Sequence, residues 1–581
     1  MSEKAVERNL SDLSARHFDV AVIGGGIAGA CIAWDACLRG FEVALVEAGD
    51  VGGATSAASG KILHGGIRYL QQAQLGRVRE SRRERQVLAN LAPHLVERVS
   101  FLVPTSGWGK RGRGLLCAGM AAYEALGWRL GERGTGAAQR GDRARLAIGR
   151  PQLLSRAAAC RREPLLASLG TACSGAIAYD EYVMRNPERL TLAVARAAAE
   201  EGAAVATYVR ACGFVRDGKR VTGVRVADVL GGAELVVRAH LVVNAAGPWA
   251  PPLAVGLAGG AAARLFHFAK GTHLITRPLT ASSAIVLATA HRHGDSLWDR
   301  GGRHFFVVPW RDCSIVGTTY DPFTGDPATA SPQPSEAHLL VAEINRALPG
   351  ADLRLSDVRY AYSGVYLEQG GGSRAATAFG YRGGRENWFC DHLAADGIDG
   401  AISVVLAKYT TARLLAREVV DLVAHRLSPR ATRPCATAVT PVWGGRVADS
   451  EAEARWLAES SGGLLPAEVA RGLLSNHGSA ASAVAAIALR EPRAADRLAP
   501  GSTTIEAEVR YACREEMAQR AEDVIFRRTA LGTTGDPGPG VTARVCVIMA
   551  EELAWSQDRR VAELEAVRRR FAALEPLAGG A

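Results

Sequence analysis

The stretch FDVAVIGGGIAGACIAWDACLRGFEVALVE, residues 18–47, decides the fold of this chain. It opens with a short apolar run that is too short for a buried helix and is followed at once by three glycines. Small and apolar residues then recur at helical spacing, and a second apolar run closes on an acidic residue. The pattern predicts a strand, a glycine turn, a helix and a second strand, which together begin an α/β domain.

The glycines of this stretch form the dinucleotide-binding pattern Gly24-x-Gly26-x-x-Gly29. Gly24 permits the tight turn, Gly26 lets the backbone approach a pyrophosphate, and Gly29 lets the helix pack closely on the sheet. The amino terminus of that helix faces the phosphate charge. Glu47, at the end of the second strand, can accept hydrogen bonds from an adenosine ribose.

Further polar groups favour the long FAD molecule over NAD as the cofactor. The pattern occurs only once, which argues against a second nucleotide-binding domain. Thr55 and Ser56 follow Glu47 in a small-residue loop, and the apolar run 240–247 ends in a glycine turn at Ala246 and Gly247. A late helix start, which carries Lys408 and Thr411, offers amides to another polar part of the cofactor.

The remaining chain predicts three kinds of structure. Short alternating runs within 266–367 indicate an antiparallel sheet, and nearly everything after a Pro/Thr-rich segment is helical. We expect a Rossmann-like FAD-binding domain, an antiparallel-sheet substrate domain and a C-terminal all-helical domain. The boundaries are 1–265 and 373–425 for the discontinuous FAD-binding domain, 266–372 for the substrate domain, 426–441 for a linker and 442–581 for the helical domain.

Composition restricts the function further. The 581 residues carry a net charge of +10, which favours a small anionic substrate or an acidic surface; no nucleic-acid-binding motif accompanies the charge. The eleven cysteines have no zinc-ligand spacing, so we expect structural thiols and no metal. The N-terminus lacks the apolar core of a secretion signal, and no run is long enough to span a bilayer. We expect a cytoplasmic protein, soluble or peripheral on the inner face of a membrane, with a homodimer as one possible assembly.

The segment KILHGGIRYL, residues 61–70, resembles the K-L-I-H-G-G-L-R-Y-L segment of FAD-dependent glycerol-3-phosphate dehydrogenases and oxidases. Further similar blocks occur in family order over almost the whole chain: RESRRERQVLANLAPHL (79–95), VVNAAGPWA (242–250), KGTHL (270–274), VGTTYDPFTGDP (316–327), YSGV (362–365), DHLAADGIDGAISV (391–404), AKYTTARLLA (407–416) and EVRYACREEMAQRAEDVIFRRT (508–529).

The resemblance implies that a substrate secondary alcohol gives a hydride to flavin N5 while its hydroxyl loses a proton. Electrons then pass to quinone, as in the dehydrogenases, or to oxygen, as in the oxidases. His64 is the expected base, since it is the imidazole of the most distinctive motif. Arg68, Lys270 and Lys408 match cationic positions of the family motifs and are the expected partners of the substrate's charge.

The departures from the family pattern gather on the substrate side. Tyr366 stands where the family motif has an arginine that we expect to hold the substrate phosphate, and a tyrosine cannot replace that bidentate contact. Gly60 replaces a serine, and further departures occur at Tyr320, Phe323, Leu406, Ala407, Tyr409 and Ala412. We therefore leave glycerol 3-phosphate, a phosphonate and another hydroxy acid open as substrates.

Two other functions and one surface remain open. The same flavoprotein superfamily includes amine and amino-acid oxidases, in which an arginine binds a carboxylate; the helical block 508–529 argues against that reading. A flavin-binding sensor without catalysis is the second alternative, against which His64 and the motif cations speak. Residues 107–134 place three basic residues before an apolar stretch flanked by Trp108 and Trp128, which suits either a lipid interface or a buried helix.

Overall fold

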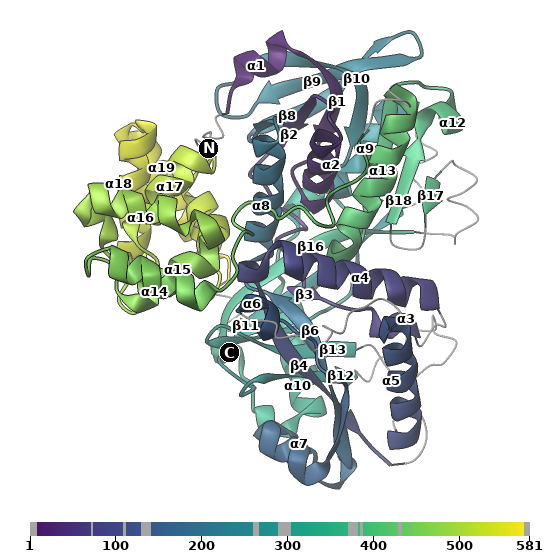
Figure 1. Cartoon of the computed structure of the whole chain (residues 1–581), viewed down its shortest axis with the longest axis vertical. Helices are drawn as coiled ribbons and strands as arrows, with labels where there is room; N and C mark the ends of the chain where they lie inside the picture. Colours follow the sequence, from purple (N-terminus) through teal and green to yellow (C-terminus); the bar gives the residue numbers. More distant parts are fainter. Residues whose placement is uncertain are drawn as a thin grey trace.

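The computed structural model of the chain describes residues 8–70, 74–107, 112–128, 141–258, 266–288, 304–369, 381–383, 387–427 and 433–574. Two mixed sheets and a block of helices make up the described chain (Figure 1). The helices α14 to α19, drawn in light green to yellow, gather on one side of the sheets. The predicted combination of an α/β part, an antiparallel-rich part and a C-terminal helical part is confirmed.

The first sheet is built on the stretch 18–47. Its main path runs β17-β18-β19-β10-β1-β2-β7, and five of these strands are parallel because helices cross between them. The helix α2 is buried on almost every side, which fits its small and apolar residues, and it packs against α8 and α13. The bounds are β1 (His17–Ile23), β2 (Val43–Val46), β7 (Ala204–Ala206), β8 (Val209–Asp217), β9 (Arg220–Asp228), β10 (Glu234–Asn244), β17 (Tyr381–Gly383), β18 (Asn387–Asp391), β19 (Ala401–Leu406), α2 (Ile27–Leu38), α8 (Pro187–Glu200) and α13 (Ala412–Leu427).

The second sheet runs β15-β11-β14-β13-β12-β4-β6-β3, with β16 beside β11 and β5 beside β6. It takes β3 to β6 from residues 62–184, so it extends beyond the predicted range 266–372. The reason is a long-range pairing, since β4 joins β12 in parallel while β6 lies antiparallel to β4. The strands are β3 (Ile62–Leu63), β4 (Val96–Thr105), β5 (Gln152–Ser155), β6 (Gly175–Met184), β11 (Phe266–Thr276), β12 (Ser283–Ala288), β13 (His304–Trp310), β14 (Cys313–Gly317), β15 (Asp321–Phe323) and β16 (Val358–Gln369).

The remaining helices flank the two sheets and fill the C-terminal block. Those in the first part are α1 (Leu10–Ala15), α3 (Ile67–Leu70), α4 (Leu75–Leu91), α5 (Arg113–Trp128), α6 (Asp142–Arg145), α7 (Arg156–Arg162), α9 (Ala250–Ala258), α10 (Pro334–Ala347) and α12 (His392–Asp396). Those in the block are α14 (Ser450–Ser460), α15 (Ala467–His477), α16 (Ala481–Arg490), α17 (Glu506–Glu515), the π-helical turn η11 (Asp523–Arg528), α18 (Pro539–Leu553) and α19 (Gln557–Ala572).

The segment considered for a lipid interface coincides partly with α5. That helix buries Met120 and Tyr123, whereas residues 108–111 and 129–134 lie outside the described residues. Over the described parts of the chain, none of the helices is both long and apolar enough to span a membrane.

Candidate cofactor and substrate site

The predicted cofactor residues converge because neighbouring parallel strands end at the same edge of the first sheet. Gly24 follows β1, Glu47 follows β2, Ala246 and Gly247 follow β10, and Lys408 follows β19. Ligands of doubly wound sheets bind outside the carboxyl ends of the strands. These five residues therefore lie at one edge of the first sheet, although they are separated by hundreds of residues in the sequence.

The glycine turn has the shape that a dinucleotide needs. Gly24 has φ +103°, and a Cβ there would lie 2.6 Å from the carbonyl oxygen of Ala245. A Cβ on Gly29 would lie 1.9 Å from the carbonyl oxygen of Gly24, so α2 packs against the turn at a distance that leaves no space for a side chain at position 29. Gly26 caps α2, and Ser56 Oγ, at 3.3 Å, is the one described atom within 4 Å of its notional Cβ. The open side at Gly26 thus leaves the helix amino terminus accessible to phosphate oxygens.

Glu47 is held in place by the turns on both sides of it. Its Oε2 accepts from the Gly25 amide at 2.6 Å, and its Oε1 accepts from the Gly49 amide at 2.8 Å. Burial raises the pKa of Glu47, while these two hydrogen bonds and the nearby charge of Arg527 oppose the rise. A fixed carboxylate at this position fits the recognition of ribose hydroxyls.

The small-residue loop after Glu47 joins the two sheets. Ser56 Oγ accepts from the Ile27 amide at 3.0 Å, so it extends the cap of α2. Thr55 Oγ1 donates to the carbonyl oxygen of Val365 on β16 at 2.6 Å. The hydroxyl of Thr55 therefore anchors the loop to the second sheet.

Lys408 lies where the first sheet meets α3 and α4. Its Nζ donates to Ser81 Oγ at 2.6 Å and stands 4.6 Å from the centre of the Tyr69 ring. Thr411, in the 3₁₀ turn that follows, accepts from Asn387 Nδ2 at 2.8 Å. Tyr69 in turn neighbours the His64 ring, with 6.4 Å between the ring centres. The structure therefore brings His64, Tyr69 and Lys408 together.

The His-Gly-Gly turn that carries His64 is fixed by buried charge. The carboxylate of Glu181 accepts from the Gly65 amide at 2.9 and 3.0 Å and also pairs with Arg85. A Cβ on Gly65 would lie 2.0 Å from the hydroxyl of Tyr123, so no larger residue fits. Burial raises the pKa of Glu181, and Arg85 opposes that rise. Packing thus sets the backbone on the C-terminal side of His64.

Lys270 lies opposite Val365, whose carbonyl oxygen binds Thr55, but its own side chain is held by other groups. Its Nζ pairs with Glu336 Oε1 at 2.9 Å and donates to the carbonyl oxygen of Ser331 at 3.1 Å. Side chains alternate along β11, so Lys270 faces away from the side that carries His273. Arg68 belongs to α3, and its side chain lies outside the described part of the chain.

His273 lies in the motif KGTHL (270–274), but it was not among the site residues predicted from the sequence. Its ring stacks on Tyr362 at 5.1 Å, and its Nε2 lies 3.3 Å from the position of a Cβ on Gly60. The Tyr362 hydroxyl donates to the carbonyl oxygen of Ser59 at 3.0 Å, so both rings border the loop at 55–60. Burial, helped by Lys61, lowers the pKa of His273 to about 3, which keeps this imidazole neutral. The signal was the histidine inside KGTHL (270–274).

Two departures from the family pattern lie on this same face of the second sheet. In the β11–β16 ladder, Tyr366 lies opposite Ala269 and Tyr362 lies opposite His273. Residues that lie opposite each other share one face of the sheet, so the side chains of Tyr366 and Tyr362 are on the same face as His273. The rings of Tyr366 and Tyr320 are 6.0 Å apart. An aromatic pair thus occupies the region in which the family motif has an arginine.

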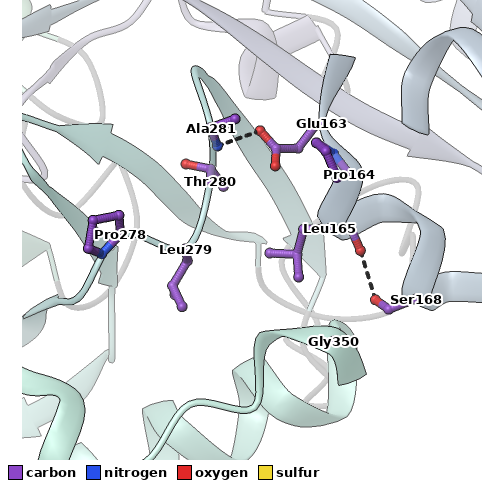
Figure 2. A pocket seen from close by; sticks show the side chains of 9 residues that line it. All are labelled: Glu163, Pro164, Leu165, Ser168, Pro278, Leu279, Thr280, Ala281 and Gly350. Carbon is purple, nitrogen blue, oxygen red and sulfur yellow. Dashed lines mark hydrogen bonds between the residues drawn. The ribbon is translucent and has the colours of Figure 1, made fainter. Parts of the chain in front are cut away.

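A hollow of about 530 Å³ lies elsewhere, in the part built on the second sheet (Figure 2). Its mostly apolar wall includes Leu165 and Leu279, while Glu163 accepts from the Ala281 amide at 3.0 Å across one end. None of the predicted site residues lines it.

One group of described residues places possible metal-binding atoms close together, namely Cys390, His392 and Asp396. Both ring nitrogens of His392 are already hydrogen-bonded, Nδ1 to Asp396 at 2.6 Å and Nε2 to Ser403 Oγ at 2.8 Å. The geometry is that of a hydrogen-bonded chain beneath the end of β10, where Asn244 reaches the same Ser403 hydroxyl.

Two family models match the chain. Residues 19–390 match the FAD-dependent oxidoreductase family, and residues 435–560 match the C-terminal domain of alpha-glycerophosphate oxidase. The two matches include the second sheet, most of the first sheet and most of the helical block; residues 391–434, which carry β19 and Lys408, lie between them.

Individual relatives agree with these matches. The chain is 30% identical over 564 residues to a glycerol-3-phosphate dehydrogenase of Synechocystis sp., which covers 95% of this chain and 96% of the relative. It is 32% identical to glycerol-3-phosphate dehydrogenase 2 of Mycobacterium tuberculosis, with 95% and 88% covered. Among solved structures, the FAD complex of the glycerol-3-phosphate dehydrogenase from Bacillus halodurans superposes with a TM-score of 0.73 over 97% of this chain and 96% of that one, at 24% identity. The fold is therefore shared along nearly the whole length. The two family models and the full-length relatives together show that this chain belongs to the FAD-dependent glycerol-3-phosphate dehydrogenase family of oxidoreductases.

Proposed function

We propose that this FAD-dependent dehydrogenase oxidises the secondary hydroxyl of glycerol 3-phosphate or of a related polyol phosphate, phosphonate or hydroxy acid. The observation that supports the proposal is that Tyr69 lies next to both His64 and Lys408, and that Lys408 follows β19 at the edge of the first sheet where Gly24 and Glu47 also lie. FAD supplies a hydride acceptor at N5 and an outlet for electrons to quinone or another acceptor.

His64 is the proposed base. It follows a two-residue strand, and the Glu181 carboxylate holds the amide of the next residue, so the turn can present the imidazole in one orientation. Removal of the hydroxyl proton at the moment of hydride loss needs a group that is positioned in this way. The buried Glu181–Arg85 pair supports His64 without itself approaching the substrate.

Lys408 and Arg68 are the proposed partners of the substrate's negative charge. Lys408 is buried beside a hydroxyl and an aromatic ring at the carboxyl edge of the first sheet, where an anion would lie near the FAD crevice. Lys270 is left out of this set because Glu336 and the opposite face of β11 account for it. Neutral His273 is added as a hydrogen-bonding group beside the loop at 55–60.

Tyr366 and Tyr320 are the proposed determinants of substrate choice. They place two phenol rings on the His273 face, and a phenol offers one hydrogen bond where an arginine offers a charged fork. We therefore expect glycerol 3-phosphate to be oxidised less efficiently than the native substrate.

The test is an anaerobic screen of the purified flavoprotein. Polyol phosphates, phosphonates, hydroxy acids and amines are mixed with the enzyme, and bleaching of the flavin spectrum is followed. The proposal requires a hydroxyl compound with a negative charge to bleach the flavin, and reduction by amines or amino acids alone would refute it. Reoxidation of the reduced enzyme by a soluble quinone or by oxygen then identifies the acceptor class.

His64→Ala provides the matched control for this screen. It should retain bound FAD and lose bleaching, which separates loss of the base from loss of the cofactor. Persistent bleaching at the wild-type rate would assign the base to another residue.

A further inference from the structure

The C-terminal helical block is joined to the FAD-binding loop by a buried cluster of charges. Asp50 lies three residues after Glu47, and its carboxylate accepts from Arg528 at 2.6 and 2.7 Å and from Arg527 Nε at 2.5 Å. The two arginines are 477 and 478 positions away in the sequence. Asp50 and Arg528 are 5% and 1% exposed. Both oxygens of one loop carboxylate are therefore bound by the helical block.

A second contact reaches the same loop from the other side. Asp523, on the turn that carries both arginines, pairs with Arg527 and accepts from the Tyr208 hydroxyl at 2.6 Å. The amide of Tyr208 donates to the carbonyl oxygen of Gly49 at 2.8 Å. The helical block thus contacts Asp50 directly through its arginines and Gly49 indirectly through Tyr208.

This segment is in direct contact with the cofactor residues. Glu47 accepts from the Gly49 amide, and the Gly52 amide donates to the carbonyl oxygen of Gly25 within the glycine turn at 3.0 Å. A shift of the loop would therefore move the ribose-binding carboxylate and the phosphate-binding turn together. The charge of Arg527 also favours the ionised form of Glu47.

We propose that Arg527 and Arg528 are positioning residues for FAD, which act through Asp50 to hold Glu47 and the glycine turn in the conformation that binds the cofactor. The helical block then contributes to the cofactor site through its contacts with this loop. Planar bidentate pairing of arginine with carboxylate supplies the directional hold that this role requires. The inference concerns FAD binding and does not depend on which substrate is oxidised.

The test measures FAD binding to the full-length chain after removal of flavin. Asp50→Asn and Arg528→Gln should weaken FAD binding by about tenfold or more, as measured by quenching of flavin fluorescence. Arg528→Lys keeps the charge without the fork and should fall between wild type and Arg528→Gln. Arg544→Gln is the control, because Arg544 also makes a bidentate contact with a carboxylate, that of Glu506, and does so inside the helical block at a more exposed position. Its FAD affinity should stay within about twofold of wild type.

Thermal melting distinguishes positioning from general stability. At a fixed FAD concentration, a ligand stabilises the folded state by an amount that grows with the logarithm of its affinity, so the FAD-induced rise in Tm should shrink in Asp50→Asn and Arg528→Gln and persist in Arg544→Gln. The inference is overturned if the folded Asp50→Asn and Arg528→Gln proteins bind FAD as wild type does. It is also overturned if each substitution lowers the Tm of the apo form and of the FAD-bound form by the same amount. If Arg528→Gln does not fold, Asp50→Asn and Arg527→Lys decide the question by the same two measurements.

Discussion

Two glycines of the cofactor turn should fail in different ways when they gain a side chain. In Gly29→Ala, the new Cβ would lie 1.9 Å from the Gly24 carbonyl oxygen, whereas ordinary contact begins near 3.4 Å. The helix α2 would have to move by about 1.5 Å, and overpacking of that kind costs about 3 kcal/mol of the free energy of unfolding. In Gly26→Val, the backbone is at φ −71°, ψ 176°, which valine adopts without strain, and the nearest atom is a serine oxygen at 3.3 Å. Loss of the glycine cap costs about 1 kcal/mol or less.

The effect on the cofactor should have the opposite order. A valine at Gly26 projects into the path of the phosphates and would remove charge-assisted hydrogen bonds to the helix amino terminus. A loss of about 3 kcal/mol corresponds to roughly a hundredfold weaker FAD binding. Urea denaturation of the apo-protein and FAD titration measure the two quantities separately. If Gly29→Ala and Gly26→Val lose equal apo-protein stability, or if Gly26→Val binds FAD with wild-type affinity, the predicted opposite order of the two effects is wrong.

The other predictions concern the base, substrate choice and pH. His64→Ala should lower the rate of flavin reduction by about a hundredfold while FAD stays bound, as stopped-flow absorbance can show; a rate near wild type would disprove the role. Tyr366→Arg should improve kcat/KM for glycerol 3-phosphate, and efficient use of that compound by wild type would show that another residue holds its phosphate. Burial lowers the pKa of His94 and His273 to about 3 in the folded protein. Between about pH 6.5 and pH 3 the unfolded chain therefore binds these protons and the folded chain does not, so the free energy of unfolding decreases as the pH decreases. Each buried histidine should lower the free energy of unfolding by about 2 kcal/mol at pH 5. His94→Asn should therefore reduce the difference in unfolding free energy between pH 7 and pH 5 by that amount. An unchanged difference would show that the pKa of His94 is not lowered in the folded protein.

Local pattern was enough to predict the glycine turn. The roles of Gly24 and Gly29 follow from spacing within one turn, and the strands of a parallel sheet end at a common edge, so Lys408 and Glu47 follow strands that end at the same edge of the first sheet. Motif similarity identified His64 but did not reveal the buried Glu181 that fixes its turn, because that contact joins residues 116 positions apart.

Orientation and long-range pairing were not predictable from the sequence alone. The motif KGTHL contains both Lys270 and His273, yet only the register of β11 shows that they face opposite sides. The second sheet recruits β3 to β6 through pairing with β12, and the Asp50 cluster joins residues 477 positions apart. No local periodicity reports contacts of this kind.

In the proposed reaction, the carbon that bears the secondary hydroxyl gives up a hydride and His64 takes the hydroxyl proton. The most direct test is anaerobic flavin reduction by the best substrate of the screen, with deuterium at that carbon compared with hydrogen. We expect deuterium to slow flavin reduction several-fold in wild type. Reduction at an unchanged rate, together with slowing when deuterium is placed at another carbon, would contradict it.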